Sequence, residues 1–222
     1  ILYQAQGFEV APYTVIQPRA WDQDRAGCLA AVAALGFPVF VKPARGGSSI
    51  GISKVKAADE LVDAIEAARG YDPKVIVEAA VPDVREIECG VLGGLGGGPP
   101  EVSVVAEIRH DGEYEFYDFE AKYLDDESHV RLDIPADLPE ELSERIRGLA
   151  AKAFEAVSAE GLARVDFFLA PDGRVLLNEI NTMPGFTPAS MFPRVWAASG
   201  VDYAALVDRL IQLALERPTG LR

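Results

Sequence analysis

A hairpin predicted over residues 162–180 constrains the fold of this chain more than any other feature. Two segments rich in β-forming residues, 162–169 and 174–180, flank the sequence Pro171-Asp172-Gly173. Proline fixes φ and glycine tolerates positive φ, so this sequence favours a tight turn. The pattern therefore predicts two antiparallel strands joined by a short turn.

Alternation of side chains along these strands brings four polar residues to one face. Arg164 and Asp166 share a face of the first strand, and Glu179 and Asn181 share a face of the second. A two-residue turn at Asp172-Gly173, the interpretation adopted here, pairs Asp166 with Glu179 and Arg164 with Asn181. A three-residue turn would shift this register by one residue.

The predicted pairing sets two carboxylates opposite each other, which calls for a compensating charge. Carboxylates about 5 Å apart repel by about 3 kcal/mol at an effective dielectric constant near 20. Asp166, Glu179 and Asn181 offer only oxygen ligands, which suit a hard cation. This set is too small for a dedicated calcium site but suits Mg²⁺ held jointly with substrate phosphates. The alternative is a solvated face on which Arg164 neutralises its neighbours.

Length and composition indicate a globular protein of one or two domains. The chain has 222 residues, of which 49% are hydrophobic and 25% are charged. No run of 18 apolar residues occurs, so no membrane-spanning segment is predicted. The net charge of −14 argues against nucleic acid as a main partner. Cys28 and Cys89 lack metal-ligand spacing, so we expect a reducing, cytoplasmic environment.

A glycine-rich segment, residues 44–52, follows a predicted strand that carries Lys42. Its backbone N–H groups can reach phosphate oxygens. It does not match the Walker A motif, because Ile52 stands where a lysine is needed, and it leads into a strand instead of the helix that a dinucleotide-binding loop requires. A hairpin tip that covers phosphates and an ordinary hairpin loop both stay possible.

The order of predicted elements indicates an α+β chain with two subdomains. We expect the boundary near residues 79–83, which break regular structure, and therefore subdomains over residues 1–82 and 83–222. The first contains the glycine-rich loop, and the second contains the hairpin with its candidate metal ligands. Predicted helices cover residues 26–35, 57–69, 139–159 and 202–216.

Several motifs in order resemble the ATP-grasp family and, within it, the D-alanine–D-alanine ligases. The similarity covers essentially the whole chain. The motifs are Val41-Lys42-Pro43 with Gly47-Ser48-Ser49-Ile50-Gly51, Val77-Glu78 with Arg85-Glu86-Ile87-Glu88, Tyr117-Asp118-Phe119-Glu120-Ala121-Lys122-Tyr123, Arg164-Val165-Asp166, and Asn178-Glu179-Ile180-Asn181-Thr182-Met183-Pro184-Gly185.

The resemblance implies an ATP-grasp fold in which ATP lies between two α+β subdomains. Lys42 and Lys122 would contact the phosphates, and Glu86 the ribose. The residues implied to bind ATP are Phe40, Lys42, Ser49, Glu78, Ala79, Val81, Glu86, Lys122 and Phe168. Phe40 and Phe168 would be walls of the adenine site, and Ala79 and Val81 would contribute only backbone atoms. The implied ligands of Mg²⁺, or of Mn²⁺ in its place, are Asp166, Glu179 and Asn181.

The resemblance also implies the chemistry. One D-alanine carboxylate would attack the γ-phosphoryl group of ATP, and the amine of a second D-alanine would attack the resulting acyl phosphate. The residues implied to act in catalysis are Ser48, Tyr123, Arg164 and Gly185. Ser190 and Met191, at the start of a predicted helix, would bind the second substrate.

The resemblance also bears on domain content, product and oligomeric state. The family carries an N-terminal domain that holds the first D-alanine, and we expect this chain, which begins at Ile1, to lack it. The alternatives are a ligase that joins D-alanine to D-lactate or D-serine, and a nucleotide-binding module without ligase activity. Tyr123 matches the dipeptide-forming branch. A homodimer is implied for the full-length enzyme.

Overall fold

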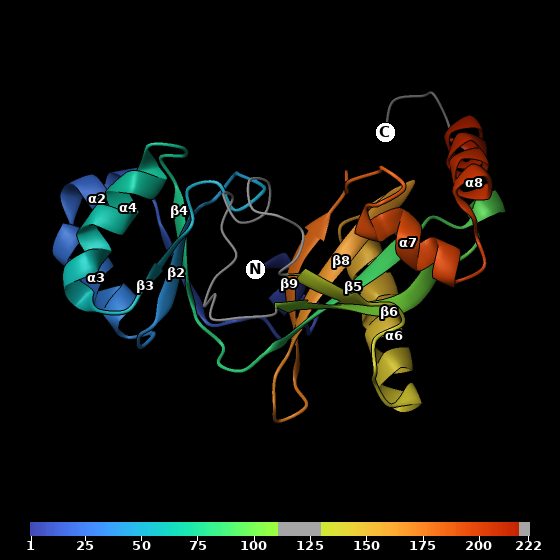
Figure 1. Cartoon of the computed structure of the whole chain (residues 1–222). Helices are drawn as coiled ribbons and strands as arrows, with labels where there is room; N and C mark the ends of the chain where they lie inside the picture. Colours follow the sequence, from blue (N-terminus) through green and yellow to red (C-terminus); the bar gives the residue numbers. More distant parts are fainter. Residues whose placement is uncertain (111–129, 218–222) are drawn as a thin grey trace. The chain divides into compact units, whose positions relative to one another are not determined.

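The computed structural model describes residues 1–110 and 130–217, and these residues form two compact units (Figure 1). The four-stranded unit consists of residues 11–82. The five-stranded unit consists of residues 1–10, 83–110 and 130–217. No helix in the described part of the chain is long and apolar enough to cross a membrane. Each unit combines a sheet with helices, so the predicted α+β class is confirmed.

The four-stranded unit is an antiparallel sheet with helices on one face. Its strands, in the order β1-β4-β2-β3, are β1 (Tyr13–Ile16), β4 (Val75–Ala79), β2 (Val39–Pro43) and β3 (Ser53–Val55). Its helices are α2 (Pro18–Gln23), α3 (Arg25–Ala33), the short 3₁₀ helix η1 (Ala58–Glu60) and α4 (Leu61–Arg69). Figure 1 shows α2, α3 and α4 gathered on the same side of the sheet.

Alternation along β2 explains which face the helices cover. Val39 and Val41 are fully buried against the helices, together with Val77 of β4. Phe40 and Lys42 point to the opposite face of the sheet and are partly exposed. The face that carries the predicted nucleotide residues of β2 is therefore the one without helices.

The five-stranded unit is also antiparallel, in the order β7-β6-β5-β8-β9. Its strands are β5 (Arg85–Leu92), β6 (Glu101–His110), β7 (Val130–Asp133), β8 (Leu162–Leu169) and β9 (Val175–Asn181). Its helices are α1 (Leu2–Ala5), the 3₁₀ helix η2 (Leu95–Gly97), α6 (Glu140–Ala156), α7 (Met191–Ala198) and α8 (Tyr203–Glu216).

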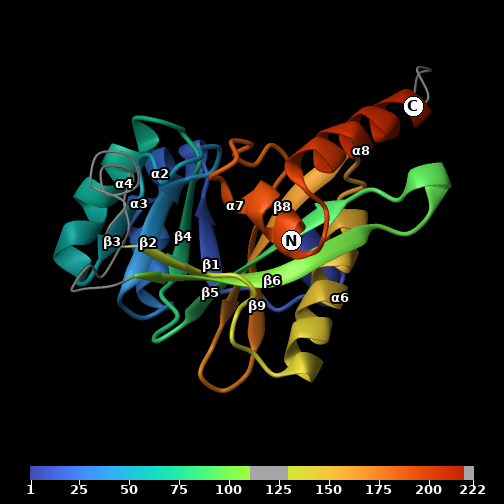
Figure 2. The same cartoon turned by 45° about the vertical axis from the view of Figure 1, so that its right-hand side comes forward.

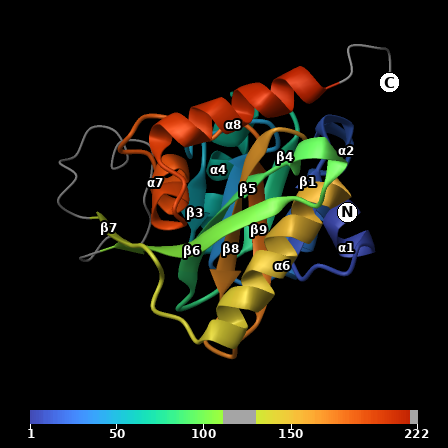
Figure 3. The ribbon, with the colours of Figure 1, turned by 90° about the vertical axis from the view of Figure 1, so that its right-hand side faces the viewer.

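Two separate hydrophobic clusters cover the two faces of this sheet. The larger cluster joins α6 to one face, through residues such as Ile146, Val165 and Phe167. The smaller cluster joins α7 and α8 to the other face, through Trp196 and Leu206. Figure 3 shows α6 lying across the sheet, and Figure 2 shows the end of α8 beside η2. The Gly96 N–H donates to Glu216 at 2.7 Å and ties these last two elements together.

The first ten residues belong to the five-stranded unit, whereas the sequence placed them with residues 11–82. Phe8 is buried in the cluster beneath α6, and Lys152 of that helix lies 5.0 Å from its ring. The Lys152 ammonium also donates to the Gln6 carbonyl at 2.7 Å. Leu177 of β9 donates its N–H to the Glu9 carbonyl. These contacts are long-range in sequence, so local patterns did not reveal them.

The central hairpin has the predicted pairing at its polar end but a different turn. The Ala170 N–H donates to the Arg174 carbonyl at 2.9 Å, so the turn has three residues, with Gly173 at φ 84°. The register then shifts by one residue beyond Phe167, where Asn178 forms a bulge. The bulge restores the pairs Asp166–Glu179 and Arg164–Asn181.

Three described elements, α2, β7 and the 3₁₀ helix η2, were absent from the sequence-based prediction. α2 begins with Pro18 at its first position and buries Trp21. β7 pairs with the end of β6. The predicted residues Lys122 and Tyr123 lie outside the described residues.

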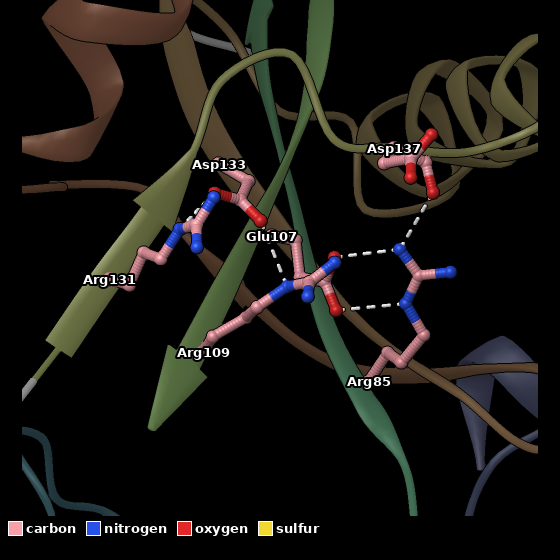
Figure 4. A network of polar contacts seen from close by, with 6 residues as sticks. All are labelled: Arg85, Glu107, Arg109, Arg131, Asp133 and Asp137. Atoms are coloured by element: carbon pink, nitrogen blue, oxygen red, sulfur yellow. Dashed lines mark hydrogen bonds and ion pairs between the residues drawn. The ribbon is translucent and has the colours of Figure 1, made fainter. Parts of the chain in front are cut away.

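A network of arginines and carboxylates on the α6 face joins β5, β6 and β7 (Figure 4). Glu107 is 3% exposed and accepts two hydrogen bonds from Arg85, at 2.8 and 2.6 Å, and one from Arg109 at 3.1 Å. Arg109 and Arg131 are opposed across β6 and β7, and both pair with Asp133 at 2.8 Å. Asp133 therefore compensates a like-charge cross-strand pair, while Glu107 is the buried centre of the network.

Replacing Glu107 by glutamine is expected to lower the free energy of unfolding by about 2 kcal/mol at neutral pH, because charge-assisted hydrogen bonds to a buried group are lost. Denaturant unfolding measures the effect. Glu101→Gln is the matched control on the same strand, because Glu101 is half exposed and pairs with Arg209 at the surface. That control should cost less than about 1 kcal/mol.

The stability difference between wild type and Glu107→Gln should also depend on pH, in a direction that the pKa of Glu107 sets. Hydrogen bonds from Arg85 lower the pKa of Glu107 below its usual value of 4.5. The stabilisation is thus present above the unfolded-state pKa and is lost as the pH falls through the folded-state pKa. The difference between wild type and Glu107→Gln should shrink as the pH falls below about 4.5. An increase on acidification would contradict the assignment.

Candidate functional site

The face of the five-stranded sheet opposite α6 brings the predicted polar residues of three strands together. Cross-strand pairs set Glu86 opposite Phe168, and Glu88 opposite Asp166. On the other side of β8, Asp166 is opposite Glu179. Because side chains alternate along each strand, the neighbouring residues of β8, such as Val165 and Phe167, point into the core beneath α6.

Arg164 is the centre of a cluster of carboxylates on this face. Its Nε and one terminal nitrogen donate to the two Asp166 oxygens at 2.8 and 2.6 Å. The same Nε lies 3.2 Å from Glu88, and the terminal nitrogen lies 3.7 Å from Glu179. Glu88 and Asp166 are buried, whereas the Glu179 side chain is 57% exposed. One planar guanidinium is thus oriented by three carboxylates.

The buried carboxylates bind protons more readily than usual. Burial raises the pKa of Asp166 to about 6, against the opposing effect of Arg164. Burial, and then the Asp166 charge, raise the pKa of Glu88 well above its ordinary value. For Arg164, burial lowers the pKa, but the hydrogen bonds to Asp166 and the nearby carboxylates outweigh it and raise the pKa overall. Three carboxylates thus face one guanidinium, and ionisation of all three would leave negative charge that Arg164 does not compensate.

This excess charge fits a divalent cation. When all three carboxylates are ionised, three negative charges face one positive charge. The Asn181 side-chain oxygen accepts from the Met183 N–H at 3.0 Å and belongs to the same end of β9. Among residues 1–110 and 130–217, no group of three or more His, Cys, Asp and Glu side chains is already arranged as a metal site. Two features therefore suit this cluster to a divalent cation: all its ligand atoms are oxygens, and its carboxylates outnumber the single arginine.

Glu88 is the residue of this cluster that the sequence analysis did not single out. It lies two residues from Glu86, so alternation places the two on one face of β5. Its contact with Arg164 depends on the pairing of β5 with β8, which joins segments far apart in the sequence. The available signal was a second acidic residue in a strand that is otherwise buried.

The segment after β9 places the predicted second-substrate residues at the start of α7. The Ser190 hydroxyl accepts from the Thr187 N–H at 3.1 Å, so it closes the preceding turn and does not cap the helix. A side chain at Gly185 would come within 3.0 Å of the Ser190 Oγ. Met191 is the first residue of α7. Gly185 and Ser190 are therefore adjacent.

In the four-stranded unit, the predicted nucleotide residues share the sheet face without helices. Lys42 and Glu78 form an ion pair at 2.5 Å, and Phe40 is directly opposite Glu78. The Ala79 N–H donates to the Pro12 carbonyl at 2.8 Å, so this N–H already has a partner within the protein. Val81 follows the end of β4 and is partly exposed. The structure thus groups Phe40, Lys42 and Glu78 on one surface.

The glycine-rich loop contains two consecutive residues with unusual backbone conformations. Ser48 and Ser49 have φ of 53° and 58°, in the left-handed region that residues with a Cβ seldom adopt. Such conformations persist only where the surroundings impose them, and they are common at ligand-binding sites. The loop joins β2 to β3, two antiparallel strands, as the sequence predicted.

Gly90 of β5, which is directly opposite Arg164 of β8, packs closely against Trp196 of α7. A Cβ at this position would lie 2.7 Å from the Trp196 indole nitrogen. Trp196 is 3% exposed and has little room to move. Gly90→Ala is therefore expected to lower the free energy of unfolding by about 1–3 kcal/mol.

Gly148→Ala is the control, because Gly148 lies inside α6 with no atom near an added Cβ. That substitution should instead raise the free energy of unfolding by about 0.5–1 kcal/mol. Denaturant unfolding followed by tryptophan fluorescence distinguishes the two. Equal effects of the same sign would contradict the contact at Trp196.

Comparisons with known proteins show that nearly the whole chain is similar to D-alanine–D-alanine ligases. A family model described as the C-terminus of D-Ala–D-Ala ligase matches residues 2–212. The D-alanine–D-alanine ligase of Kineococcus radiotolerans is 58% identical over 226 residues, which cover 100% of this chain and 59% of that protein. The ligase of an Arthrobacter species is 55% identical over 223 residues, which cover 100% of this chain and 58% of that protein.

Solved structures give the same result. The D-alanine–D-alanine ligase of Coxiella burnetii is similar with a TM-score of 0.79 and 35% identity, over 97% of this chain and 55% of that chain. The VanG D-Ala:D-Ser ligase of Enterococcus faecalis is similar with a TM-score of 0.80 and 33% identity, over 96% of this chain and 59% of that chain. The chain thus spans less than two thirds of the length of these proteins. It belongs to the D-alanine–D-alanine ligase C-terminal family and has the ATP-grasp fold.

Proposed function

We propose that this chain is the ATP-binding and catalytic part of an enzyme that joins two D-alanines into D-alanyl-D-alanine, a precursor of peptidoglycan. The observation that carries the proposal is the single face on which β5, β8 and β9 assemble Glu86, Arg164, Asp166 and Glu179. The similarity of the whole chain to D-alanine–D-alanine ligases supports it.

The reaction needs activation of a carboxylate before an amine can attack it. The first D-alanine carboxylate displaces ADP from the γ-phosphorus, which gives an acyl phosphate. The amine of the second D-alanine then attacks the acyl carbon and loses a proton, and phosphate leaves. Both steps depend on positioning and charge stabilisation, so no covalent protein nucleophile is required.

We assign ATP contacts on each unit separately. On the four-stranded unit, Lys42 and Ser49 contact phosphates, and Phe40, Glu78 and the backbone near Val81 contact adenine. The proposal requires Lys42 to exchange its ion pair with Glu78 for phosphate oxygens. Because the Ala79 N–H is used by Pro12, the carbonyl is the Ala79 group assigned to adenine.

On the five-stranded unit, Glu86 accepts from the ribose hydroxyls and Phe168 lies against the adenine. The two are directly opposed across β5 and β8. Lys122 is assigned to the phosphates, as the resemblance implies. These contacts would orient the nucleotide.

Asp166, Glu179 and Asn181 are the side chains that would hold Mg²⁺, or Mn²⁺ in its place. The ion, when bound, neutralises charge on the transferring phosphoryl group. Burial and the ion pair with Arg164 keep the Asp166 carboxylate in a fixed orientation. Glu179 is more exposed and supplies the adaptable oxygen.

Arg164 is assigned to the developing negative charge on the attacked carbonyl oxygen, together with the Gly185 N–H. Such donors are typically worth about 3–4 kcal/mol each. Ser48 and Tyr123 are proposed to assist in catalysis, and Ser190 and Met191 to bind the carboxylate of the second substrate at the start of α7. Homodimer formation is a prediction from the resemblance, and cytoplasmic location is a prediction from the isolated cysteines.

A D-serine-using ligase is a second candidate, because the VanG D-Ala:D-Ser ligase has the same fold over 96% of the chain. The higher identity to D-alanine–D-alanine ligases, 58% against 33%, favours the dipeptide product. Competition between D-alanine, D-serine and D-lactate as second substrate, with products separated by mass, decides between them. A predominance of the D-serine or D-lactate product would overturn the assignment.

Two measurements test the main proposal. Calorimetry with ATP and Mg²⁺ on this chain should show nucleotide binding. The protein at its full natural length should release ADP and form D-alanyl-D-alanine only when D-alanine is present. ATP binding without any ligation product in the full-length protein would support a nucleotide-binding module instead. An absence of ATP binding would contradict both.

A further inference from the structure

The glycine-rich loop, residues 44–52, is fastened at its first end to the turn between α4 and β4. Arg45 donates from Nε and a terminal nitrogen to the two Asp72 oxygens, at 2.8 and 2.9 Å. Asp72 is 2% exposed. The Lys74 N–H donates to the same carboxylate at 3.0 Å, and the Ala44 N–H donates to the Lys74 carbonyl at 2.9 Å. The stem of the loop is thus held by several hydrogen bonds to one short turn.

The last glycine of the loop, Gly51, contacts the same turn. Gly51 has φ of 74°, and a Cβ at this position would lie 2.6 Å from the Tyr71 ring and 2.9 Å from the Pro43 side chain. The Tyr71 ring therefore lies directly over Gly51. Adjacent residues, Tyr71 and Asp72, thus contact the two ends of the loop.

Between these ends the loop holds Ser48 and Ser49 in the left-handed conformation. That conformation is unfavourable for residues with a Cβ, so a loop with unrestrained ends would leave it. Fixing both ends reduces the number of backbone conformations that the residues between them can adopt. The anchors therefore oppose relaxation at the two serines.

The Arg45–Asp72 pair differs from the pairs that only join helices. The Arg45 side chain is 78% exposed and adds little to the core, whereas its carboxylate partner is almost fully buried. Hydrogen bonds from Arg45 and from the Lys74 N–H lower the pKa of Asp72, so the anchor is ionised at neutral pH. By contrast, Arg69 at the end of α4 pairs with Asp22 of α2 at 3.2 Å, away from the loop. Asp22, whose side chain is 65% exposed, thus offers a control that also pairs with an arginine but lies away from the loop.

We propose that Asp72, with Tyr71 beside it, is a positioning residue that holds the glycine-rich loop in the conformation that receives the phosphates of ATP. Asp72 itself touches no nucleotide and acts through Arg45. The inference rests on the proposed ATP-binding function. It assigns a role in phosphate recognition to a turn that carries none of the residues in the resemblance.

The test compares affinities for ATP and AMP at fixed Mg²⁺, because their difference reports on the β- and γ-phosphates. Wild type, Asp72→Asn and Asp22→Asn are measured by calorimetry, with the melting temperature of each protein. Asp72→Asn is expected to weaken ATP binding at least 10-fold and to change AMP binding less than 2-fold. Asp22→Asn should leave both affinities unchanged.

Arg45→Ala provides a second variant in case Asp72→Asn does not fold, since Arg45 is largely exposed. It should reproduce the selective loss for ATP, and the double variant should lose no more than either single variant. A parallel loss of ATP and AMP affinity, or ATP binding equal to that of wild type, would overturn the positioning role. A wild-type chain that does not bind ATP would instead refute the proposed function on which the inference rests.

Discussion

Asp166→Asn is expected to lower the affinity of the chain for Mn²⁺ more than about 100-fold. The substitution removes one ionised oxygen ligand, whereas loss of groups that only orient metal ligands typically costs 10–100-fold. It also replaces one of the two oxygens that accept from Arg164 by an amide NH2 donor, and it removes the carboxylate charge from a buried ion pair. Breaking a buried pair costs about 3–5 kcal/mol, so the folded state will be less stable as well.

A second ligand separates metal binding from stability. The Glu179 side chain is 57% exposed, and its contact with Arg164 is long, at 3.7 Å. Glu179→Gln should therefore preserve the melting temperature. It should still weaken Mn²⁺ binding at least 10-fold. Electron paramagnetic resonance of free Mn²⁺ measures both variants, with circular dichroism as the check on folding. Unchanged Mn²⁺ affinity in a folded Glu179→Gln protein would remove this residue from the metal site.

Arg164→Lys is expected to reduce kcat of the full-length enzyme by about 100- to 1,000-fold while ATP affinity changes less than 3-fold. Lysine retains the charge but cannot reproduce the planar fork that donates to both Asp166 oxygens. The ammonium would also lose the geometry that faces Glu88. Steady-state rates of ADP release at saturating substrates, with calorimetry for ATP, give the two quantities.

Arg174→Lys is the control for this prediction, because Arg174 pairs with Asp172 in the exposed turn of the same hairpin. It should leave kcat unchanged. A variant at Arg164 that loses ATP binding but turns over normally at saturation would show that this arginine binds nucleotide and takes no part in the chemical steps.

The hairpin shows what local sequence can and cannot predict. Pro171-Asp172-Gly173 correctly predicted a turn, and the carboxylate pair of Asp166 and Glu179 was also correct. The turn nevertheless has three residues, which alone would have displaced the pairing by one. The bulge at Asn178 reverses that displacement. A bulge is decided by packing on both faces of the sheet, so no pattern in the hairpin sequence revealed it.

Long-range contacts account for the other differences. Glu88 could not be connected to Arg164 without knowing that β5 lies beside β8. Residues 1–10 precede the four-stranded unit in sequence but pack with the five-stranded unit, because Phe8 and the Glu9 carbonyl find their partners on α6 and β9. α2 is different, since Pro18 at its first position was a local signal that the sequence analysis did not use.

The strict alternation in β8 determines how this part of the protein can vary during evolution. Val165 and Phe167 hold the sheet to α6, while Arg164, Asp166 and Phe168 occupy the opposite face. Replacements of Val165 and Phe167 therefore act on the packing against α6, whereas replacements on the polar face act on the charge cluster. Insertion or deletion of one residue within the strand would exchange the two sets of side chains at once. Divergence in this strand is therefore expected to proceed through replacements, and changes in length should be confined to the turn at residues 171–173.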